Sequence, residues 1–521
     1  MTYTALTRLD AGLWRSAELG FQLDYSGAVA GDGTLRAADL EAEAPAWATA
    51  FEFIAALEAG AVANPDERRR VGHYWLRAPD LAPDGLGAGI EAARAACRAV
   101  AAEAHASGQF DAALILGIGG SALGPQLIAD ALAQPTDRLR LHFLDNTDPD
   151  GFARVLAPLD LARTLVVCIS KSGGTAETRN ALLHTQAAYA RARIDFASRA
   201  VAVSGEGSAL WRSAEGWRAR LPMWDWVGGR TSLCSAVGLL PMDLQGVDTD
   251  AFLRGAAAMD VATRVPTLTE NPAALLAAVW YRLAEGRARR AMVVLPYRDR
   301  LALLSRYLQQ LIMESLGKAF DLEGREVRQG LTVYGNKGST DQHAYVQQLR
   351  DGPDDHFVCF VGVLDDGACE LGNTPVEVEP GLDSADFLQG FMLGTRAALR
   401  AQGHGTLSLL LERVDAFRMG ALTALFERAV GLYAARVGIN AYDQPGVEAG
   451  KRAATAILAG KAALLAALSD TPEPIDLIAA RAGVADVESA WFLLSRLAAN
   501  GRGVRVAPGP TPSADRFARG G

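Results

Sequence analysis

The stretch that decides the fold runs from Ala113 to Leu132 and reads Ala-Leu-Ile-Leu-Gly-Ile-Gly-Gly-Ser-Ala-Leu-Gly-Pro-Gln-Leu-Ile-Ala-Asp-Ala-Leu. Its opening apolar run has no polar alternation, which is typical of a strand buried on both faces of a parallel sheet. Glycines end the run, and Pro125 then suits the first turn of a helix whose apolar residues recur at helical spacing. The stretch therefore predicts a strand, a glycine loop and a helix.

The glycine loop is a candidate anion site. Gly117, Gly119 and Gly120 let the backbone approach a ligand closely, and N–H groups at a helix start can donate to phosphate or sugar oxygens. Ser121 places a hydroxyl directly after the glycines, which favours binding. The alternative is a tight strand-to-helix turn that holds no ligand.

Length and composition bound the class of protein. The chain has 521 residues, which suggests about three domains. Half of its residues are hydrophobic and 21% are charged, as in ordinary globular proteins. A net charge of −9 argues against a general nucleic-acid or anionic-membrane surface. We therefore expect neither a nucleic-acid nor a membrane partner.

The cysteines and the absence of targeting segments indicate the compartment. The odd number of cysteines and the lack of any CxxC pair disfavour a disulfide framework or a zinc site. These cysteines are Cys97, Cys168, Cys234, Cys359 and Cys369. Residues 1–7 lack a basic segment followed by an apolar core, and no run of 18 apolar residues occurs. We expect a soluble cytoplasmic protein with reduced thiols.

Strands and helices alternate from Ala113 onward, which predicts parallel strands joined by crossover helices. The expected fold is α/β, with two doubly wound sandwiches and mainly parallel sheets. Further strands are expected near 138–144, 164–169, 200–203, 292–295, 331–334, 357–364 and 406–411. The expected domains are a helical N-terminal region (1–110), a first α/β domain (111–265), a second with C-terminal helices (266–470), and a small helical extension (471–521).

The end of the chain carries clear helix signals. A helix over 422–437 should stop at Gly438, and a last long helix should run from about 447 to 468. Two amphipathic patterns come next, at Ile475–Ala482 and Val487–Ala499, and could mimic a helix-turn-helix. Six arginines against five acids in this extension are too balanced for a nucleic-acid surface.

A second loop, from Ser170 to Thr178, reads Ser-Lys-Ser-Gly-Gly-Thr-Ala-Glu-Thr and comes after a strand that ends at Ile169. The hydroxyls of Ser170, Ser172 and Thr175 and the ammonium of Lys171 gather at one helix start, which predicts a phosphate cradle. Walker spacing is absent, so a nucleoside triphosphate is not expected. The alternative is that Thr175 only caps the helix and Lys171 is solvated.

Together these motifs resemble the glucose-6-phosphate isomerase family, which is built from sugar isomerase (SIS) domains. The resemblance covers about residues 70–465, in the family's order. Besides the two loops it rests on Gly228-Gly229-Arg230-Thr231-Ser232, Ser235-Ala236-Val237-Gly238, Gln310 to Lys318, Gly338 to His343, and Asp443 to Lys451. The loop Gly335-Asn336-Lys337-Gly338 departs from the Gly-Glu-Pro-Gly of animal members, and nothing beyond 470 matches. Neither departure removes a family catalytic residue.

Several single residues suit proton transfer or charge stabilisation. Glu314 lies one helical turn after Gln310, where partial burial would favour a general base; a surface glutamate is the alternative. His343 is expected near the start of a helix at Gln342, where a neutral ring is favoured; a capping or core histidine would look the same. Arg230 comes after two glycines that let its guanidinium reach an oxyanion, although a structural ion pair would match equally well.

The resemblance implies reversible isomerisation of glucose 6-phosphate and fructose 6-phosphate through a cis-enediolate, in glycolysis and gluconeogenesis, without metal or organic cofactor. It assigns the phosphate to the Ser170–Thr175 cradle and ring opening to His343, with Lys451 nearby. It makes Glu314 the base and Arg230 the group that stabilises the oxyanion. Ser121, Gln310 and Gln444 would bind the sugar. Taken alone, Lys451 would be an ordinary exposed cation.

The resemblance also implies a homodimer in which His343 comes from the neighbouring subunit. Two other functions stay open. One is an isomerase that also accepts mannose 6-phosphate, which depends on pocket shape around C2. The other is a non-catalytic sugar-phosphate-binding SIS regulator, which would not need Glu314, His343, Arg230 and Lys451 together.

Overall fold

The computed structural model describes residues 9–29, 33–367 and 376–520. It divides into two compact units, Met1–Asp443 and Gln444–Gly521. The expectations on residues 1–7 and on Cys369 lie outside the described residues. The finer division into four domains stays a prediction. No helix of the described chain is long and apolar enough to span a membrane.

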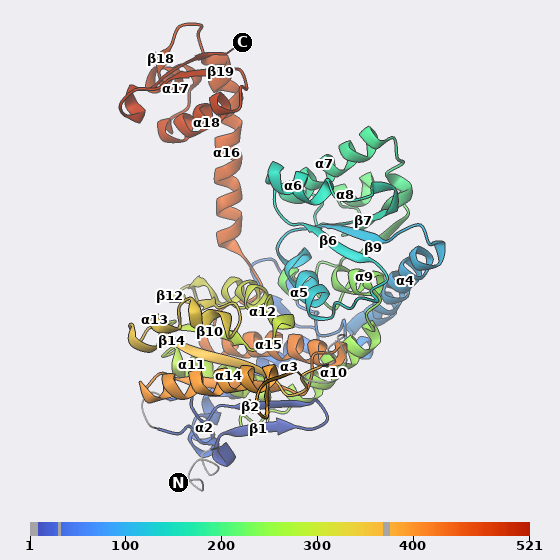
Figure 1. Cartoon of the computed structure of the whole chain (residues 1–521), viewed down its shortest axis with the longest axis vertical. Helices are drawn as coiled ribbons and strands as arrows, with labels where there is room; N and C mark the ends of the chain where they lie inside the picture. Colours follow the sequence, from blue (N-terminus) through green and yellow to red (C-terminus); the bar gives the residue numbers. More distant parts are fainter. Residues whose placement is uncertain (1–8, 30–32, 368–375, 521) are drawn as a thin grey trace. The chain divides into compact units, whose positions relative to one another are not determined.

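The first sheet of the larger unit is entirely parallel, with strand order β6-β5-β7-β8-β9. Figure 1 labels β6, β7 and β9 of this sheet. The sheet contains the predicted strand of the opening stretch and the next three expected along the chain. Its strands are β5 (Ala112–Leu116), β6 (Arg140–Leu144), β7 (Thr164–Ile169), β8 (Ala200–Ser204) and β9 (Ala219–Pro222). All residues of β5, β7 and β8 are buried, as expected for strands covered on both faces.

Helices cover both faces of this sheet. Alternate residues of β5 enter different cores: Ala113 and Ile115 join the main core of the unit, whereas Leu114 and Leu116 join a second cluster with α7 and its neighbours. The predicted doubly wound arrangement is therefore confirmed. The helices are α4 (Leu86–Ser107), α5 (Leu123–Ala131), α6 (Pro149–Leu156), α7 (Ala176–Ala192), α8 (Ala209–Ser213) and α9 (Ala236–Gln245).

The second sheet has the order β1-β2-β17-β14-β10-β13. Strands β17, β14, β10 and β13 run parallel to one another, and each of them overlaps a strand expected from the sequence. The hairpin β1–β2 adds to β17 in antiparallel register, so part of the N-terminal region, which was expected to be helical, forms strands instead. The strands are β1 (Leu13–Ser16), β2 (Phe21–Asp24), β10 (Ala291–Pro296), β13 (Val333–Tyr334), β14 (His356–Val363) and β17 (Thr406–Leu411).

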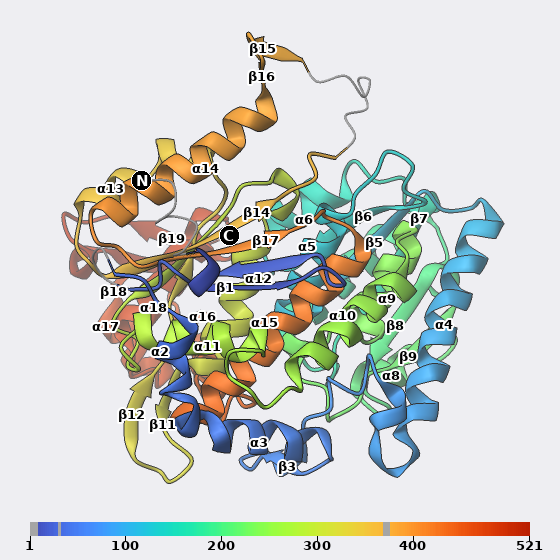
Figure 2. The same ribbon diagram turned by 90° about the horizontal axis from the view of Figure 1, so that it is seen from below.

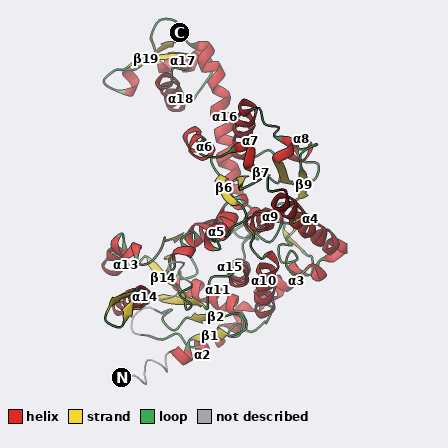
Figure 3. Cartoon of the chain, turned by 45° about the vertical axis from the view of Figure 1, so that its right-hand side comes forward, coloured by secondary structure: helices red, strands yellow, loops and turns green. Residues whose placement is uncertain are grey.

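The helices around this sheet complete the α/β sandwich, and Figure 3 shows strands lying between layers of helices. Short hairpins extend from the unit at β3–β4, β11–β12 and β15–β16. The helices are α2 (Ala37–Glu41), α3 (Ala48–Glu58), α10 (Thr249–Thr263), α11 (Pro272–Leu283), α12 (Leu304–Leu308), α13 (Val346–Asp351), α14 (Ser384–Ala401) and α15 (Ala416–Val437). The hairpin strands are Val62–Asn64, Arg69–Arg70, Lys318–Phe320, Glu326–Gln329, Glu377–Glu379 and Leu382–Asp383.

Helices α10 and α15 pack side by side through the centre of the unit (Figure 2). Glycine makes this approach possible, because a Cβ on Gly255 would lie 1.7 Å from Phe417 O and one on Gly420 would lie 1.9 Å from Phe252 O. Helix α15 is buried along most of its length and ends, as predicted, at Gly438, whose φ of 71° closes it in the left-handed region.

A buried ionic cluster joins these two helices to the N-terminal segments. Arg77 donates to Asp260 at 2.6 and 2.8 Å, and Arg428 donates to Asp260 at 2.8 Å and to Glu58 at 2.7 and 2.9 Å. Although burial opposes it, the guanidiniums of Arg428 and Arg77 hold the pKa of Asp260 well below its ordinary value. These ion pairs with Arg77 and Arg428 offset the cost of burying the charged Asp260 carboxylate in the core.

The second unit has its own small core. Helices α16 (Pro445–Ala467), α17 (Ile475–Ala482) and α18 (Val487–Ala499) confirm the three helices expected here. Leu464, Ile478, Leu494 and Phe517 are among its fully buried side chains. A three-stranded antiparallel sheet of order β18-β20-β19 was not expected; its strands are Glu473–Pro474, Arg516–Arg519 and Val504–Ala507.

Candidate active site

The glycine loop after β5 lies against two other segments of the first unit. A Cβ on Gly120 would lie 2.0 Å from Gly229 O, and one on Gly119, whose φ is +58°, would lie 3.0 Å from the Gln310 side-chain nitrogen. Only a residue without a side chain permits both approaches. The loop that carries Ser121 is therefore in contact with the Gly228–Arg230 segment and with the helix of Glu314.

Arg230 lies at the centre of this contact, in the short 3-10 turn Gly229–Thr231. Its Nη2 donates to Ala441 O at 2.7 Å and to Asp443 O at 2.9 Å, and its Nη1 lies 3.2 Å from Glu314 Oε1. Burial lowers the pKa of the Arg230 guanidinium, while the charges of Glu314 and Asp443 oppose that shift. The interpretation of Glu314 as a surface glutamate is wrong, because the structure pairs it with a buried arginine.

Glu314 ends a π-helical segment, Gln309–Glu314, that continues α12. Segments of π-helix are rare and occur frequently at functional sites. While Oε1 faces Arg230, Oε2 is buried and accepts no hydrogen bond from the described residues. A buried carboxylate oxygen without a donor is costly unless a ligand supplies one, so this oxygen is suited to accept a proton from a bound substrate.

The predicted cradle forms the turn between β7 and α7. Ser170 is buried, and its Oγ accepts a hydrogen bond from Gly173 N at 3.1 Å and lies 3.4 Å from Thr175 Oγ1. Ser172 Oγ accepts from Gly174 N at 3.1 Å. Thr175 is the N-cap residue of α7, but its side chain makes no capping hydrogen bond. The turn therefore gathers three hydroxyls at the N-terminus of a 17-residue helix.

Lys171 is turned toward the segment that leads to Arg230. Its Nζ donates to Asp225 O at 2.7 Å and to Val227 O at 3.0 Å. Burial, together with the nearby charge of Arg69, lowers the pKa of Lys171 to about 8. The alternative of a solvated Lys171 is wrong, and the ammonium links the cradle to the Arg230 loop.

The remaining predicted residues lie in different places. His343 is exposed and ends the 3-10 turn Thr340–His343, three residues before α13, so no helix begins at Gln342 in the way expected. Gln310 lies in the π-helical segment, one turn before Glu314. Gln444 and Lys451 belong to the second unit, where Gln444 precedes α16 and Lys451 lies in its second turn.

Two site residues were missed by the sequence reasoning. Lys318 and Asp443 were quoted only as ends of motifs, yet Lys318 contacts Glu314 O and Asp443, and Asp443 O accepts from Arg230. The available signal was their place in the same two motifs as Glu314 and Gln444. Nothing local distinguishes a buried lysine from an exposed one in such a motif.

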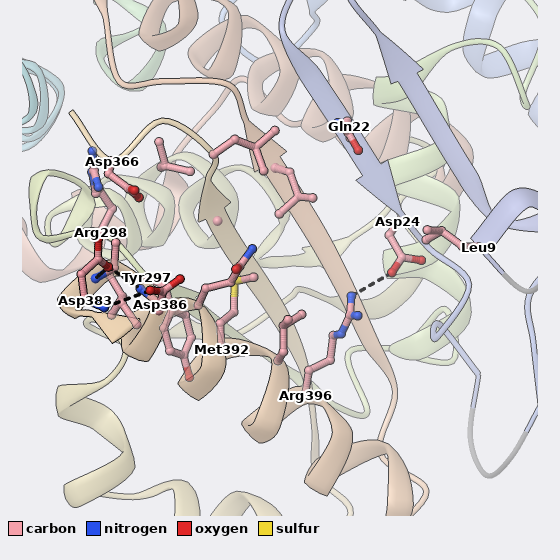
Figure 4. Close-up of a pocket in the computed structure, with 18 of the residues that line it drawn as sticks. Leu9, Gln22, Asp24, Tyr297, Arg298, Asp366, Asp383, Asp386, Met392 and Arg396 are labelled. Carbon is pink, nitrogen blue, oxygen red and sulfur yellow. Dashed lines mark hydrogen bonds and ion pairs between the residues drawn. The ribbon is translucent and has the colours of Figure 1, made fainter. Parts of the chain in front are cut away.

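A cavity of about 290 Å³ lies elsewhere in the first unit, beside the carboxyl ends of β10 and β14 and under α14 (Figure 4). Figure 4 shows Arg396 on α14 paired with Asp24 of β2, at 3.0 Å. None of the catalytic or substrate-binding residues predicted from the sequence lines this cavity. Its remaining carboxylates come from Asp366, Asp383 and Asp386.

These observations define a class first: a double α/β sandwich with three hydroxyls gathered at the start of one helix, and a paired carboxylate and guanidinium beside a glycine loop. The sequence profile of the phosphoglucose isomerase family matches residues 48–374 and 366–466. Because this match covers most of the chain, the protein belongs to the phosphoglucose isomerase family. The resemblance recognised in the sequence is thereby confirmed.

Individual relatives agree with this assignment. A glucose-6-phosphate isomerase of Synechococcus sp. strain JA-3-3Ab is 53% identical over 488 residues, which cover 91% of each chain. One of Cyanothece sp. strain PCC 7425 is 51% identical over 97% of this chain and 96% of the relative. Among solved structures, a glucose-6-phosphate isomerase of Chlamydia trachomatis matches with a TM-score of 0.79 at 28% identity, covering 87% of this chain and 90% of that one.

Proposed function

We propose that this protein catalyses the reversible isomerisation of glucose 6-phosphate and fructose 6-phosphate, a step of glycolysis and gluconeogenesis. The observation that carries the proposal is the Glu314–Arg230 pair, with one buried carboxylate oxygen left for a substrate proton. Curated relatives with this name cover more than nine-tenths of the chain at 51–53% identity. The family and the relatives favour this activity over the mannose 6-phosphate and regulator alternatives.

The proposed mechanism divides the work among the predicted residues. Ser170, Lys171, Ser172 and Thr175 hold the phosphate, where hydroxyls, an ammonium and the helix N-terminus offset its charge. Once the sugar ring is open, Glu314 removes the proton at C2, and the electron pair of that C–H bond forms the C1=C2 bond of the enediolate as the carbonyl pair moves onto O1. The hydroxyl proton of O2 passes to O1, and Glu314 returns its proton to C1, so C2 becomes the carbonyl carbon.

Arg230 faces the same carboxylate and would stabilise the negative oxygen of the enediolate, which develops only along the reaction path. His343 and Lys451 open the ring by moving protons at its oxygens, and Ser121, Gln310 and Gln444 orient the hydroxyls. No metal or organic cofactor is part of this proposal. The four described cysteines are buried free thiols, which accords with a reducing, cytoplasmic setting.

A coupled assay tests the activity directly. Purified protein, treated with a chelator and dialysed, should convert fructose 6-phosphate to glucose 6-phosphate, as followed by a dehydrogenase specific for the product. Parallel assays with mannose 6-phosphate report dual specificity. Saturable binding of either hexose phosphate without conversion would support the regulator instead.

We further propose a homodimer in which His343 completes the site of the neighbouring subunit. His343 is exposed, and its neighbour Gln342 donates to Phe391 O of α14 at 3.2 Å. Exposed apolar side chains gather on α14 and the β15–β16 hairpin beside it, and such patches mark interfaces. They are Val376, Val378, Leu382, Phe391 and Leu393.

Mixing two inactive variants tests the shared site. Co-refolded Glu314→Gln and His343→Ala should recover up to about half of the wild-type activity per heterodimer, because one of its two sites then holds both native residues. The matched control is Glu314→Gln mixed with Arg230→Met. Glu314 and Arg230 pair within one chain, so these heterodimers have no intact site and should stay inactive. Equal results for the two mixtures, or an active wild-type monomer, would rule out the shared site.

A further inference from the structure

Lys318 is a buried lysine to which the proposed mechanism gives no role. It comes four residues after Glu314, begins the β11–β12 hairpin and is only 7% exposed. Its Nζ donates to Glu314 O at 2.9 Å and to Asp443 O at 3.0 Å, and it lies 3.2 Å from Asp443 Oδ1. The ammonium therefore donates to two backbone carbonyls and forms an ion pair with the Asp443 carboxylate.

The contacts of Lys318 and Arg230 form a closed ring. Arg230 Nη2 donates to the same carbonyl, Asp443 O, at 2.9 Å, and Arg230 Nη1 faces the Glu314 carboxylate at 3.2 Å. Lys318 thus holds Glu314 by its backbone, and Arg230 holds it by its side chain. Because both cations share one carbonyl oxygen, a shift of Lys318 would be passed to Arg230 and to the carboxylate.

Burial makes this arrangement costly. Desolvation lowers the pKa of Lys318 and the charge of Arg230 lowers it further, while Asp443 opposes both. A lysine that only satisfies a free carbonyl at a helix end could do so from the surface, with most of its charge in water. Holding an ammonium beside a buried guanidinium needs a compensating role.

We propose that Lys318 is a positioning residue of the isomerase reaction, which fixes the Glu314 carboxylate against Arg230 through Asp443. This inference rests on the proposed function of Glu314. A misplacement of about 1 Å in a reacting group can cost about a hundredfold in rate. Lys318 therefore acts on the proton-transfer step and leaves the phosphate cradle unchanged.

The test is Lys318→Met, which keeps the length of the side chain and removes its charge and donors. We expect kcat to fall about ten- to a hundredfold with KM within about twofold of wild type. The kinetic isotope effect on glucose 6-phosphate deuterated at C2 should rise, because proton transfer then limits turnover more strongly. Lys318→Arg should restore part of kcat, since a guanidinium can still donate to both carbonyls.

The matched control is Arg325→Met in the same hairpin. Arg325 is 68% exposed and pairs with Asp321 at 2.7 Å, so its loss should leave kcat and the isotope effect unchanged. If Lys318 were only a helix cap, Lys318→Met would lower the melting temperature while the surviving folded enzyme kept the wild-type kcat and isotope effect. That result would overturn the proposal.

If Lys318→Met does not fold, a second variant, Asp443→Asn, tests the positioning role of Lys318. Asp443→Asn keeps the shared carbonyl and removes the anion, so we expect a fall in kcat of a fewfold with a raised isotope effect. Wild-type values of both in Asp443→Asn would then overturn the positioning role. Failure of the proposed function is distinguishable, because wild-type protein would itself lack isomerase activity.

Discussion

The two sheets of the first unit differ in the loops at their carboxyl ends. Strands β5, β7 and β9 of the parallel sheet lead into the glycine loop, the hydroxyl cradle and the Arg230 loop. Strands β10 and β13 of the mixed sheet lead into the segments that carry Glu314 and His343. The proposed mechanism therefore divides the work between the sheets: loops of the parallel sheet hold the phosphate, and segments of the mixed sheet carry the groups proposed to transfer protons.

The electrostatics agree with this division. The cradle beside β7 offers hydroxyls, an ammonium and a helix N-terminus. The cavity beside β10 and β14 is lined by four carboxylates and only two guanidiniums, and it would repel a phosphate dianion. Two sandwiches of similar architecture therefore present different charges to a ligand because of the residues in their loops, since fold alone does not set function.

The largest effect is expected on kcat when Glu314, the proposed proton-transfer residue, is replaced. Glu314→Gln keeps the shape of the side chain and removes its basicity, so kcat should fall at least about 10²–10⁴-fold while KM stays within a fewfold. Steady-state assays at several pH values measure both constants. Glu326→Gln, at an exposed position of strand β12, is the control and should behave as wild type. Near-normal turnover of Glu314→Gln would remove Glu314 from the mechanism.

The next largest effect is expected on KM when hydroxyls of the proposed phosphate cradle are removed. The double change of Ser170→Ala and Thr175→Ala removes two hydroxyls from the cradle, and we expect KM to rise about ten- to a hundredfold with kcat changed much less. Inhibition by a six-carbon sugar-acid phosphate should weaken in parallel.

A matched control for the cradle is Ser198→Ala. Ser198 lies before β8, at the amino end of the same sheet, so its hydroxyl is remote from the cradle. Unaltered inhibition in the double variant, with a normal melting temperature, would show that the phosphate binds elsewhere.

The smallest effect is a pH dependence of binding. The pKa of Lys171 is lowered to about 8, so its ammonium is positive below that pH and becomes neutral above it. KM should therefore be nearly flat below about pH 7, about double by pH 8 and then rise, approaching tenfold per unit, because the neutral amine no longer attracts the phosphate. Lys171→Arg keeps its charge and should remove the rise. An equal rise in both proteins would assign it to another group.

The fold could be predicted where local pattern determines the outcome. The fully apolar strand β5, the glycine loop and the left-handed Gly438 each arise from their own residues. The hairpin β1–β2 could not be predicted in this way, because its four-residue strands gain their place by pairing with β17, as in Leu23 opposite Leu409. The two-residue strand β18 was missed for the same reason.

The site shows the same limit. Glycine spacing indicated the anion loops, since close backbone approach requires those residues. The Glu314–Arg230 contact joins residues 84 positions apart, and the shared carbonyl of Asp443 lies farther still along the chain. No local pattern specifies such contacts. The resemblance to the family named Glu314 and Arg230, but only the structure relates them to Lys318.

The most direct test of the central claim is isotope incorporation from solvent. Fructose 6-phosphate incubated with chelator-treated protein in D₂O should yield glucose 6-phosphate that carries deuterium at C2 in part of the product, as measured by proton magnetic resonance. This is expected because the proton on Glu314 can exchange with solvent between C1 and C2. Glu314→Gln should incorporate none. Isomerisation without deuterium in either sugar, as a hydride shift would give, would contradict the account.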